Sequence, residues 1–339
     1  AILSYINYGF AIFFTIFYSY HLFYLVISLV RRTKQFEPAA PHRYAFVIPA
    51  RNEASVIGQL ILSIKRQEYP AEMMDIYVVA DNCSDRTAEI ARQAGAIVWE
   101  RYDEHHIGKG YALNFLFSRI KEITITYDGY IIVDADNILE KNYLCEMNKA
   151  FAAGHRIITS YRNSKNYGSN WISAGYSLWF LREAKFLNNA RMILGTSCAI
   201  SGTGFLVHRE IIEKNEGWKH YLLTEDIEFT VDSILEGERI AYCSSAILYD
   251  EQPTELDQAW KQRLRWAKGI LQVFGAYGRR LFEGFINTGN FSLYDMLMTI
   301  FPVIILGLVG FTINLSAVII LAFTSSEQLF KLLRSIWIA

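Results

Sequence analysis

A short apolar run that ends at two carboxylates constrains the fold more than any other stretch. Ile131 to Val133 lie within the segment YIIVDADN of residues 130–137, and Asp134 and Asp136 follow them. Three β-branched residues in a row are typical of a buried strand. Alternate side chains of an extended chain share one side, so both carboxylates can face one point. A divalent cation, Mg²⁺ or Mn²⁺, would relieve their repulsion and hold a diphosphate, although a helix cap and a turn use the same residue types.

The first half of the chain alternates predicted strands and helices. Strands are predicted at residues 45–50, 75–81, 96–101 and 130–134. Helices are predicted between them, at residues 54–67, 85–94 and 109–120. This order predicts an α/β domain whose mostly parallel sheet carries helices on both faces. Because ligands bind beyond the carboxyl ends of such strands, the sequence places one site at the side chains that end them, which are Pro49, Asp81, Asp134 and Asp136.

The second half continues with longer helices. Strands are predicted at residues 157–162, 205–208 and 240–248, and helices at residues 170–190 and 225–235. A further helix runs from Thr254 past Trp266 toward Gly284 and is rich in Arg, Lys, Trp, Leu and Phe. That composition suits an amphipathic helix at a membrane face.

Two long uncharged runs flank this region. Residues 2–30 contain no charged side chain apart from a protonatable His21, and residues 296–323 contain none. Both are long enough to span a bilayer, with Pro302 tolerated inside the second span. The basic residues directly after the first run place the following domain in the cytoplasm.

This pattern predicts a multi-pass protein of the plasma membrane with four parts. They are an N-terminal transmembrane helix (1–30), a cytoplasmic catalytic domain (31–253), interface helices (254–290) and a C-terminal transmembrane region (291–339).

The charge and the cysteine content disfavour nucleic-acid-binding, zinc-binding and disulfide-rich proteins. The formal net charge is −1 and there is no long basic block, so nucleic acid is not an expected partner. The four cysteines form no C-x-x-C pair, which disfavours a zinc site or a disulfide framework and fits reduced cytoplasmic thiols.

Four further clusters have a chemical interpretation and a structural alternative. Asp81 begins a polar DNCSD turn that could contact a nucleotide, or that could simply cap a helix. Lys109, between two glycines, could approach a diphosphate, or could be a solvated lysine at a helix start. The segment Thr224-Glu225-Asp226 could cap a helix or supply a general base. The segment QRLRW of residues 262–266 could bind a diphosphate and a sugar face, or could anchor a helix at a membrane interface.

Six motifs in order resemble the membrane-embedded family-2 glycosyltransferases, which include cellulose, hyaluronan and chitin synthases. They are VIPARNE (47–53), VVADNCSD (78–85), GKGYALN (108–114), DAD (134–136), TED (224–226) and QRLRW (262–266). The resemblance covers residues 44–275 and implies a GT-A fold, an inverting mechanism and a Mg²⁺ or Mn²⁺ cofactor.

The resemblance also implies roles for single residues. Asp226, with Glu225 beside it, would be the catalytic base, and Asp136 with Asp134 would bind the metal. The donor would contact Asp81, Lys109, Asp134, Arg265, Pro49 and Glu53. The acceptor would contact Trp266, Gly202, Thr203 and Gln262. No gating-loop motif of the F-x-V-T-x-K kind follows QRLRW, which leaves processivity and export open.

Three functions compete on this sequence. The first is an inverting β-glycan synthase that uses a UDP-sugar, with UDP-glucose favoured over UDP-N-acetylglucosamine, and extends a glycan acceptor at the inner face of the bilayer. The second is transfer of one sugar to a membrane lipid or a polyprenyl phosphate. The third is a non-catalytic sensor of nucleotide sugars, which the presence of a candidate base disfavours.

Overall fold

A mixed sheet forms the centre of the structure, a computed structural model that describes residues 2–33, 35–324 and 326–338. Within these residues the sheet has eight strands in the order β3-β2-β1-β4-β7-β6-β8-β5. Their bounds are β1 Tyr44–Ala50, β2 Met74–Asp81, β3 Ile97–Arg101, β4 Gly129–Ile132, β5 Ile138–Leu139, β6 Ile157–Ser164, β7 Phe205–His208 and β8 Ile240–Asp250. The pairings leave only β5 and β7 antiparallel to the others, so the predicted mostly parallel α/β sheet is confirmed.

The central strands are apolar because both of their faces are covered. Every residue of β1 except Pro49 is buried, as are the last six residues of β2. Pro49 lacks an N–H, but it lies beyond Val47–Ile132, the last residue pair between β1 and β4. The proline therefore lies where β1 no longer pairs with β4, near the carboxyl edge of the sheet at which the sequence predicts the site.

Helices connect these strands. The connecting elements are α3 Ile57–Lys65, the 3-10 turn Ala71–Met73, α4 Thr87–Gln93, α5 Lys109–Lys121, α6 Tyr143–Ala152, α9 Arg209–Lys214 and α10 Glu225–Leu235. Parallel crossovers are right-handed, so α3 and α4 cover one face of the sheet and α5 covers the other. The predicted helices agree with α3, α4, α5 and α10 within a few residues, whereas α6, α9 and β5 had not been predicted.

The helix predicted at residues 170–190 is longer and is not uniform. It consists of α7 Trp171–Leu181, a π-helical segment Arg182–Asn188, and α8 Asn189–Leu194. Asn170 caps its start, because its side chain accepts hydrogen bonds from the N–H groups of Ile172 and Ser173. Gly195, with φ of 78°, ends it in the left-handed conformation.

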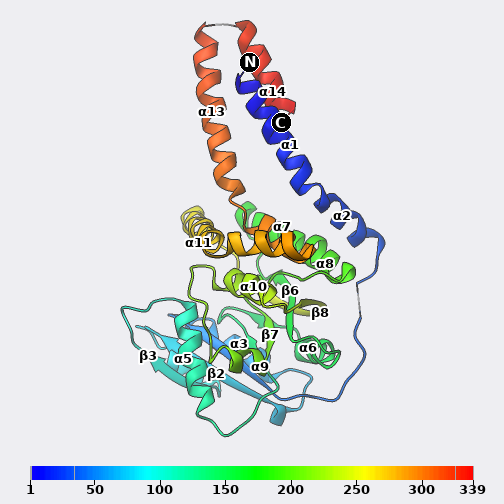
Figure 1. The fold of residues 1–339 in the computed structure, drawn as a ribbon. Coiled ribbons are helices and arrows are strands. Elements are labelled where there is room, and N and C mark those ends of the chain that lie inside the picture. The colour runs from blue at the N-terminus through cyan, green and yellow to red at the C-terminus, as the bar shows by residue number, and fades with distance from the viewer. Residues whose placement is uncertain (1, 34, 325, 339) are drawn as a thin grey trace.

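Helices α1, α13 and α14 extend away from the sheet, with α7, α8 and α11 between them and the strands (Figure 1). The helices of the two terminal regions are α1 Ile2–Tyr18, α2 Tyr20–Val30, α11 Leu256–Thr288, α12 Phe291–Ile300, α13 Val303–Thr324 and α14 Ser326–Ile338. Within the described residues one helix, at Ile305–Thr324, is long and apolar enough to cross a membrane. The α1–α2 pair, bent by 40°, would be a second if it forms a single span.

The apolar run predicted as one span at residues 296–323 is two helices. α12 ends at Ile300 and α13 begins at Val303, because Phe301 precedes Pro302 and adopts an extended conformation with ψ of 136°. α12 contacts α10 and α11, and most of its side chains are buried. Its residues therefore pack on the domain, and the prediction that Pro302 lies inside a membrane helix is wrong for this structure.

A buried ion pair attaches α12 to α8. The guanidinium of Arg191 binds the Asp295 carboxylate through Nε at 2.7 Å and Nη2 at 2.9 Å. The hydroxyls of Tyr20 and Tyr24 in α2 donate to the same carboxylate at 3.0 and 2.8 Å. These contacts satisfy a charge that would otherwise be costly to bury, and they join the N-terminal helix pair to the domain.

Candidate active site

The predicted strand ends do converge on one cavity. Its volume is about 270 Å³. Its lining residues come from the end of β1, the end of β2, the start of α5 and the loop after β4; they are Pro49, Ala50, Arg51, Glu53, Asp81, Gly108, Lys109, Ala112, Asp134, Ala135 and Asp136. Six of the predicted donor and metal residues thus share one hollow at the carboxyl edge of the parallel strands, as such sheets favour.

Lys109 connects this cavity to the neighbouring loop. Its ammonium group lies 2.6 Å from the Asp134 carboxylate, 3.5 Å from Glu225, and donates to the carbonyl of Gly202 at 2.6 Å. Burial acts to lower the pKa of Lys109, but these carboxylates outweigh it and hold that pKa above its usual value. The lysine is therefore a fixed positive charge at the edge of the cavity.

The two glycines around Lys109 have different physical roles. Gly108 has φ of 144°, a conformation that side-chain-bearing residues rarely adopt. A Cβ on Gly110 would lie 2.0 Å from the carbonyl oxygen of His220. One glycine is thus required by the turn and the other by close packing of α5, and together they place the lysine.

Asp136, in the loop after β4, lies among several other carboxylates. Burial and the neighbouring carboxylates of Asp250, Asp134 and Glu53 raise the pKa of Asp136 to about 8. Asn137 donates to Asp136 at 3.1 Å and to Asp250 at 2.8 Å, which orders the group.

These carboxylates fit a divalent cation that is also held by a diphosphate. Among the described residues no three His, Cys, Asp or Glu side chains are placed to hold a metal ion. Mg²⁺ commonly uses only one or two carboxylates together with phosphate oxygens, and Asp134 and Asp136 can supply these.

Asp81 is buried and has a basic partner that the sequence had not indicated. Its Oδ1 lies 2.5 Å from Nη1 of Arg101, the last residue of β3. The same guanidinium binds Asp103 at 2.9 Å and the carbonyl of His106 at 2.8 Å. This pair fixes the Asp81 carboxylate at the wall of the cavity, where a polar group of a ligand can reach it.

A second set of predicted residues lies on the other side of Lys109. The loop before β7 contains Gly202 and Thr203, and the Gly202 N–H donates to Oδ2 of Asp226 at 2.7 Å. The Thr203 hydroxyl accepts from the N–H of Asp134 at 2.8 Å. Glu225 is largely buried beside Lys109; burial raises its pKa to about 7, although Lys109 opposes the shift. The residues predicted to bind the metal and the donor are therefore joined to the candidate base through one loop.

The QRLRW residues lie on α11 and do not line the cavity. Arg265 is exposed and donates to the Leu223 carbonyl at 3.2 Å, directly before the TED segment. Trp266 packs on Tyr176, with ring centroids 5.7 Å apart. Oε1 of Gln262 is buried without a hydrogen-bond partner among the described residues. These side chains therefore lie outside the cavity that the other predicted donor residues line.

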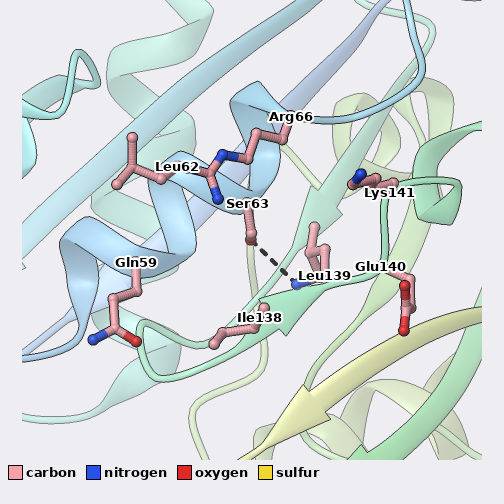
Figure 2. Close-up of a pocket in the computed structure, with 8 residues that line it drawn as sticks. All are labelled: Gln59, Leu62, Ser63, Arg66, Ile138, Leu139, Glu140 and Lys141. Atoms are coloured by element: carbon pink, nitrogen blue, oxygen red, sulfur yellow. Dashed lines mark hydrogen bonds between the residues drawn. The ribbon is translucent and has the colours of Figure 1, made fainter.

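A larger cavity lies away from all of these residues. It has a volume of about 350 Å³ and is formed between α3 and the β5 segment, as Figure 2 shows. Its lining includes Leu62, Arg66, Ile138 and Lys141. The Ser63 hydroxyl accepts a hydrogen bond from the N–H of Leu139 at 3.2 Å. This cavity is larger than the one beside Lys109, but it lacks the converging carboxylates and the lysine. We therefore take the smaller cavity as the candidate active site.

Three charged residues near the site had been missed. Arg101 ends β3, Asp250 ends β8, and Arg162 near the end of β6 binds Asp250 through Nε at 2.9 Å. Arg162 also donates to the carbonyl of Ser201 at 3.0 Å. The strand-end rule that identified Asp81 would have found Arg101 and Arg162, which end the strands predicted at residues 96–101 and 157–162. It would have missed Asp250, because the last predicted strand ended at residue 248 and β8 continues to Asp250.

Comparison with known proteins establishes the family. The model described as "Glycosyltransferase like family 2" matches residues 41–269, and the chain belongs to this family. A mannosyltransferase from Pyrobaculum calidifontis, solved with GDP-Man and Mn²⁺, shares the fold with a TM-score of 0.62 at 15% identity, over 99% of this chain and 97% of that one.

Curated relatives match this chain at 25–27% identity. The chain is 26% identical over 280 residues to the probable glycosyltransferase YdaM of Bacillus subtilis, covering 76% of this chain and 62% of that protein. It is 27% identical to a beta-monoglucosyldiacylglycerol synthase of Trichormus variabilis, over 77% and 56%. It is 25% identical to the poly-beta-1,6-N-acetyl-D-glucosamine synthase of Staphylococcus aureus, over 74% and 59%. The chain thus spans about 56–62% of the length of these relatives.

Proposed function

We propose that the chain is an inverting, metal-dependent glycosyltransferase that moves a hexose from a UDP-sugar, with glucose favoured, to a growing β-linked glycan at the inner face of a membrane. The observation that carries this proposal is the position of Lys109. It lies between the Asp134 carboxylate of the donor cavity and the Gly202 carbonyl of the loop that holds Asp226. A donor diphosphate and an acceptor hydroxyl could therefore meet on either side of one lysine.

The donor would be held by the residues of the smaller cavity. Asp81, fixed by Arg101, would accept a hydrogen bond from the base, and Pro49 and Glu53 would form the adjoining wall. Lys109 would exchange its contact with Asp134 for a diphosphate oxygen. A divalent cation held by Asp134 and Asp136 would supply positive charge to the leaving diphosphate.

The transfer step would be performed by Asp226. Its Oδ2 accepts from the Gly202 N–H, and Oδ1 has no hydrogen bond among the described residues. Oδ1 is thus available to take the proton of the attacking hydroxyl. Arg265 and Trp266 would reach the diphosphate and the acceptor sugar after a movement of α11 toward the cavity, which is a proposal that a donor-bound structure would test.

The test is the size of the product. The protein reconstituted in a membrane is incubated with Mg²⁺ or Mn²⁺ and a panel of labelled UDP-sugars, and labelled products are sized. A large product that a β-glucanase digests is the expected result. If no UDP-sugar were consumed with either metal, the proposed donor class would be wrong.

A second candidate function is transfer of one sugar to a membrane lipid. It is favoured by the names of three of the curated relatives, which are beta-monoglucosyldiacylglycerol synthases at 25–27% identity. The same donor residues would serve it. A small labelled product that extracts into organic solvent would select this function over the polymerase.

A further inference from the structure

α7 and the π-helical segment after it form a wall next to the predicted acceptor region. The rings of Tyr176 and Phe180 contact Trp266, with centroids 5.7 and 6.2 Å apart. The guanidinium carbon of Arg162 lies 3.9 Å from the centroid of the Phe180 ring. This wall therefore extends from the tryptophan of QRLRW to the residues that hold the Ser201 loop.

Glu183 continues the same face of this helix. It follows Phe180 by three positions and Tyr176 by seven, a spacing that puts all three side chains on one side. It lies in the π-helical segment Arg182–Asn188, and π-helical turns occur frequently at functional sites. Its Oε2 accepts a hydrogen bond from the Ser201 hydroxyl at 3.1 Å.

Glu183 and Asp226 meet consecutive residues of one loop. Ser201 bonds to Glu183, and the N–H of the next residue, Gly202, bonds to Asp226 at 2.7 Å. The two carboxylates are close enough that Asp226 adds to the electrostatic cost of ionising Glu183. Glu183 thus lies beside the candidate base and on the side of Trp266.

The Glu183 carboxylate has few partners of its own. Among the described residues it forms no ion pair, and Ser201 is its hydrogen-bond partner. Burial raises its pKa, while the Ser201 hydrogen bond and the charge of Arg162 oppose that rise. Glu183 is partly buried. A partly buried carboxylate without a paired cation is incompletely compensated, and a bound donor of hydrogen bonds would offset this cost.

We propose that Glu183 binds the acceptor by accepting hydrogen bonds from sugar hydroxyls that neighbour the hydroxyl deprotonated by Asp226. The inference rests on the proposed transfer function and specifies its acceptor as a carbohydrate. A sugar ring presents several adjacent hydroxyls to a carboxylate that can accept from more than one of them. A diacylglycerol offers one hydroxyl, which Asp226 would occupy, so Glu183 would gain no contact from it.

The experiment measures acceptor binding and transfer separately. The full chain in lipid nanodiscs is loaded with UDP and Mn²⁺, and binding of cellobiose is measured by calorimetry for the wild type, Glu183→Gln and Ser201→Ala. Hydrogen bonds to a charged group predict about 10- to 100-fold weaker cellobiose binding for Glu183→Gln, with UDP binding unchanged. Ser201→Ala, which keeps the carboxylate, should stay within about threefold of the wild type. Glu122→Gln, on an exposed helix end, is the matched control.

Several results would overturn the inference. Equal weakening in Glu183→Gln and Ser201→Ala would mean that Glu183 acts only by holding the loop. Wild-type affinity in Glu183→Gln, or no binding of cellobiose by the wild type, would remove its role in the acceptor site. A third contrary result would be that the protein transfers sugar to dioctanoylglycerol, that Glu183→Gln does not change this rate, and that cellobiose does not bind. This result would rule out a role of Glu183 in acceptor binding, but it would agree with a glycosyltransferase activity. Failure to consume any UDP-sugar would instead contradict the proposed function, and cellobiose binding would still test Glu183.

Discussion

Asp226 is the residue whose replacement is expected to slow the transfer step most. Its Oδ2 is held by the Gly202 N–H, so replacement by asparagine preserves the shape of the site but removes the proton acceptor. We expect Asp226→Asn to lower kcat by about 10²- to 10⁴-fold, because that is the usual contribution of a positioned general base. UDP affinity should not change.

Turnover and UDP binding of purified Asp226→Asn check this expectation. Asp257→Asn is the control, since Asp257 is exposed on α11 and, within the described part of the chain, forms an ion pair only with Lys261, at 2.6 Å. Normal turnover by Asp226→Asn would assign the base to another group, with Glu225 the first alternative.

Asp136 is expected to make donor binding depend on a metal. Its carboxyl lies among three other carboxylates, a grouping that favours a bound cation. In wild-type protein, EDTA should weaken UDP binding by about tenfold or more relative to Mn²⁺, since the diphosphate would lose its counter-ion. Asp136→Ala should bind UDP equally weakly with and without Mn²⁺. UDP titrations with each metal and with EDTA measure this, and retained Mn²⁺ dependence in the variant would contradict the assignment.

At the scale of elements, the contact between α11 and the start of α10 sets the position of the TED segment. A Cβ on Gly269 of α11 would lie 2.5 Å from Cγ2 of Thr224, the residue before Glu225. Gly269→Ala should therefore push the two helices apart and destabilise the protein by about 1–3 kcal/mol, as overpacked cores do. It should also lower kcat, because Glu225 and Asp226 would move.

Another glycine of α11 provides the control. Gly275 has no atom within 4 Å of an added Cβ, so Gly275→Ala should leave kcat unchanged and stabilise the helix by up to about 1 kcal/mol. Denaturant unfolding and steady-state kinetics of both variants, together with a Thr224→Ala/Gly269→Ala double variant, measure the coupling. Equal behaviour of the two glycine variants would show that the contact does not position the site.

At the scale of the whole molecule, α13 is expected to anchor the protein. Ile305–Thr324 is almost wholly exposed outside a membrane, and Leu315 lies near its middle. Leu315→Arg should disfavour insertion by about 2.5–3.5 kcal/mol, the cost of an arginine at a helix centre. A glycosylation-reporter assay on residues 303–324 measures the inserted fraction, with Leu315→Ile as control. Undiminished insertion of the arginine variant would contradict the assignment of a span here.

Polar contacts join the terminal helices to the domain. The bent α1–α2 pair reaches the domain through Tyr20 and Tyr24, and α12 reaches it through Asp295, which also binds Arg191. Asn7 of α1 and Asn314 of α13 exchange side-chain hydrogen bonds at 2.9 Å. Apolar helices from the first and last parts of the sequence thus lie together, as Figure 1 also shows.

The sequence alone predicted most of the sheet and the gathering of its strand-end residues at one cavity. Apolar strands that end at Asp81 and Asp134 are local patterns, and parallel strands bring their carboxyl ends to one edge whatever the details of packing. The helix at Glu225–Leu235 and the strand at Phe205–His208 were likewise predicted at their observed bounds, because caps and apolar periodicity act over only a few residues.

Tertiary structure decided what depends on contacts between distant residues. The packing of α12 on α10 and α11 places its residues on the domain, whereas the apolar pattern alone predicts that residues 296–300 belong to a membrane span. The pairing of Asp81 with Arg101 and the approach of Glu183 to Ser201 join residues that are 20 and 18 positions apart. No periodicity records such pairs, because they arise only when separate elements meet around a shared loop.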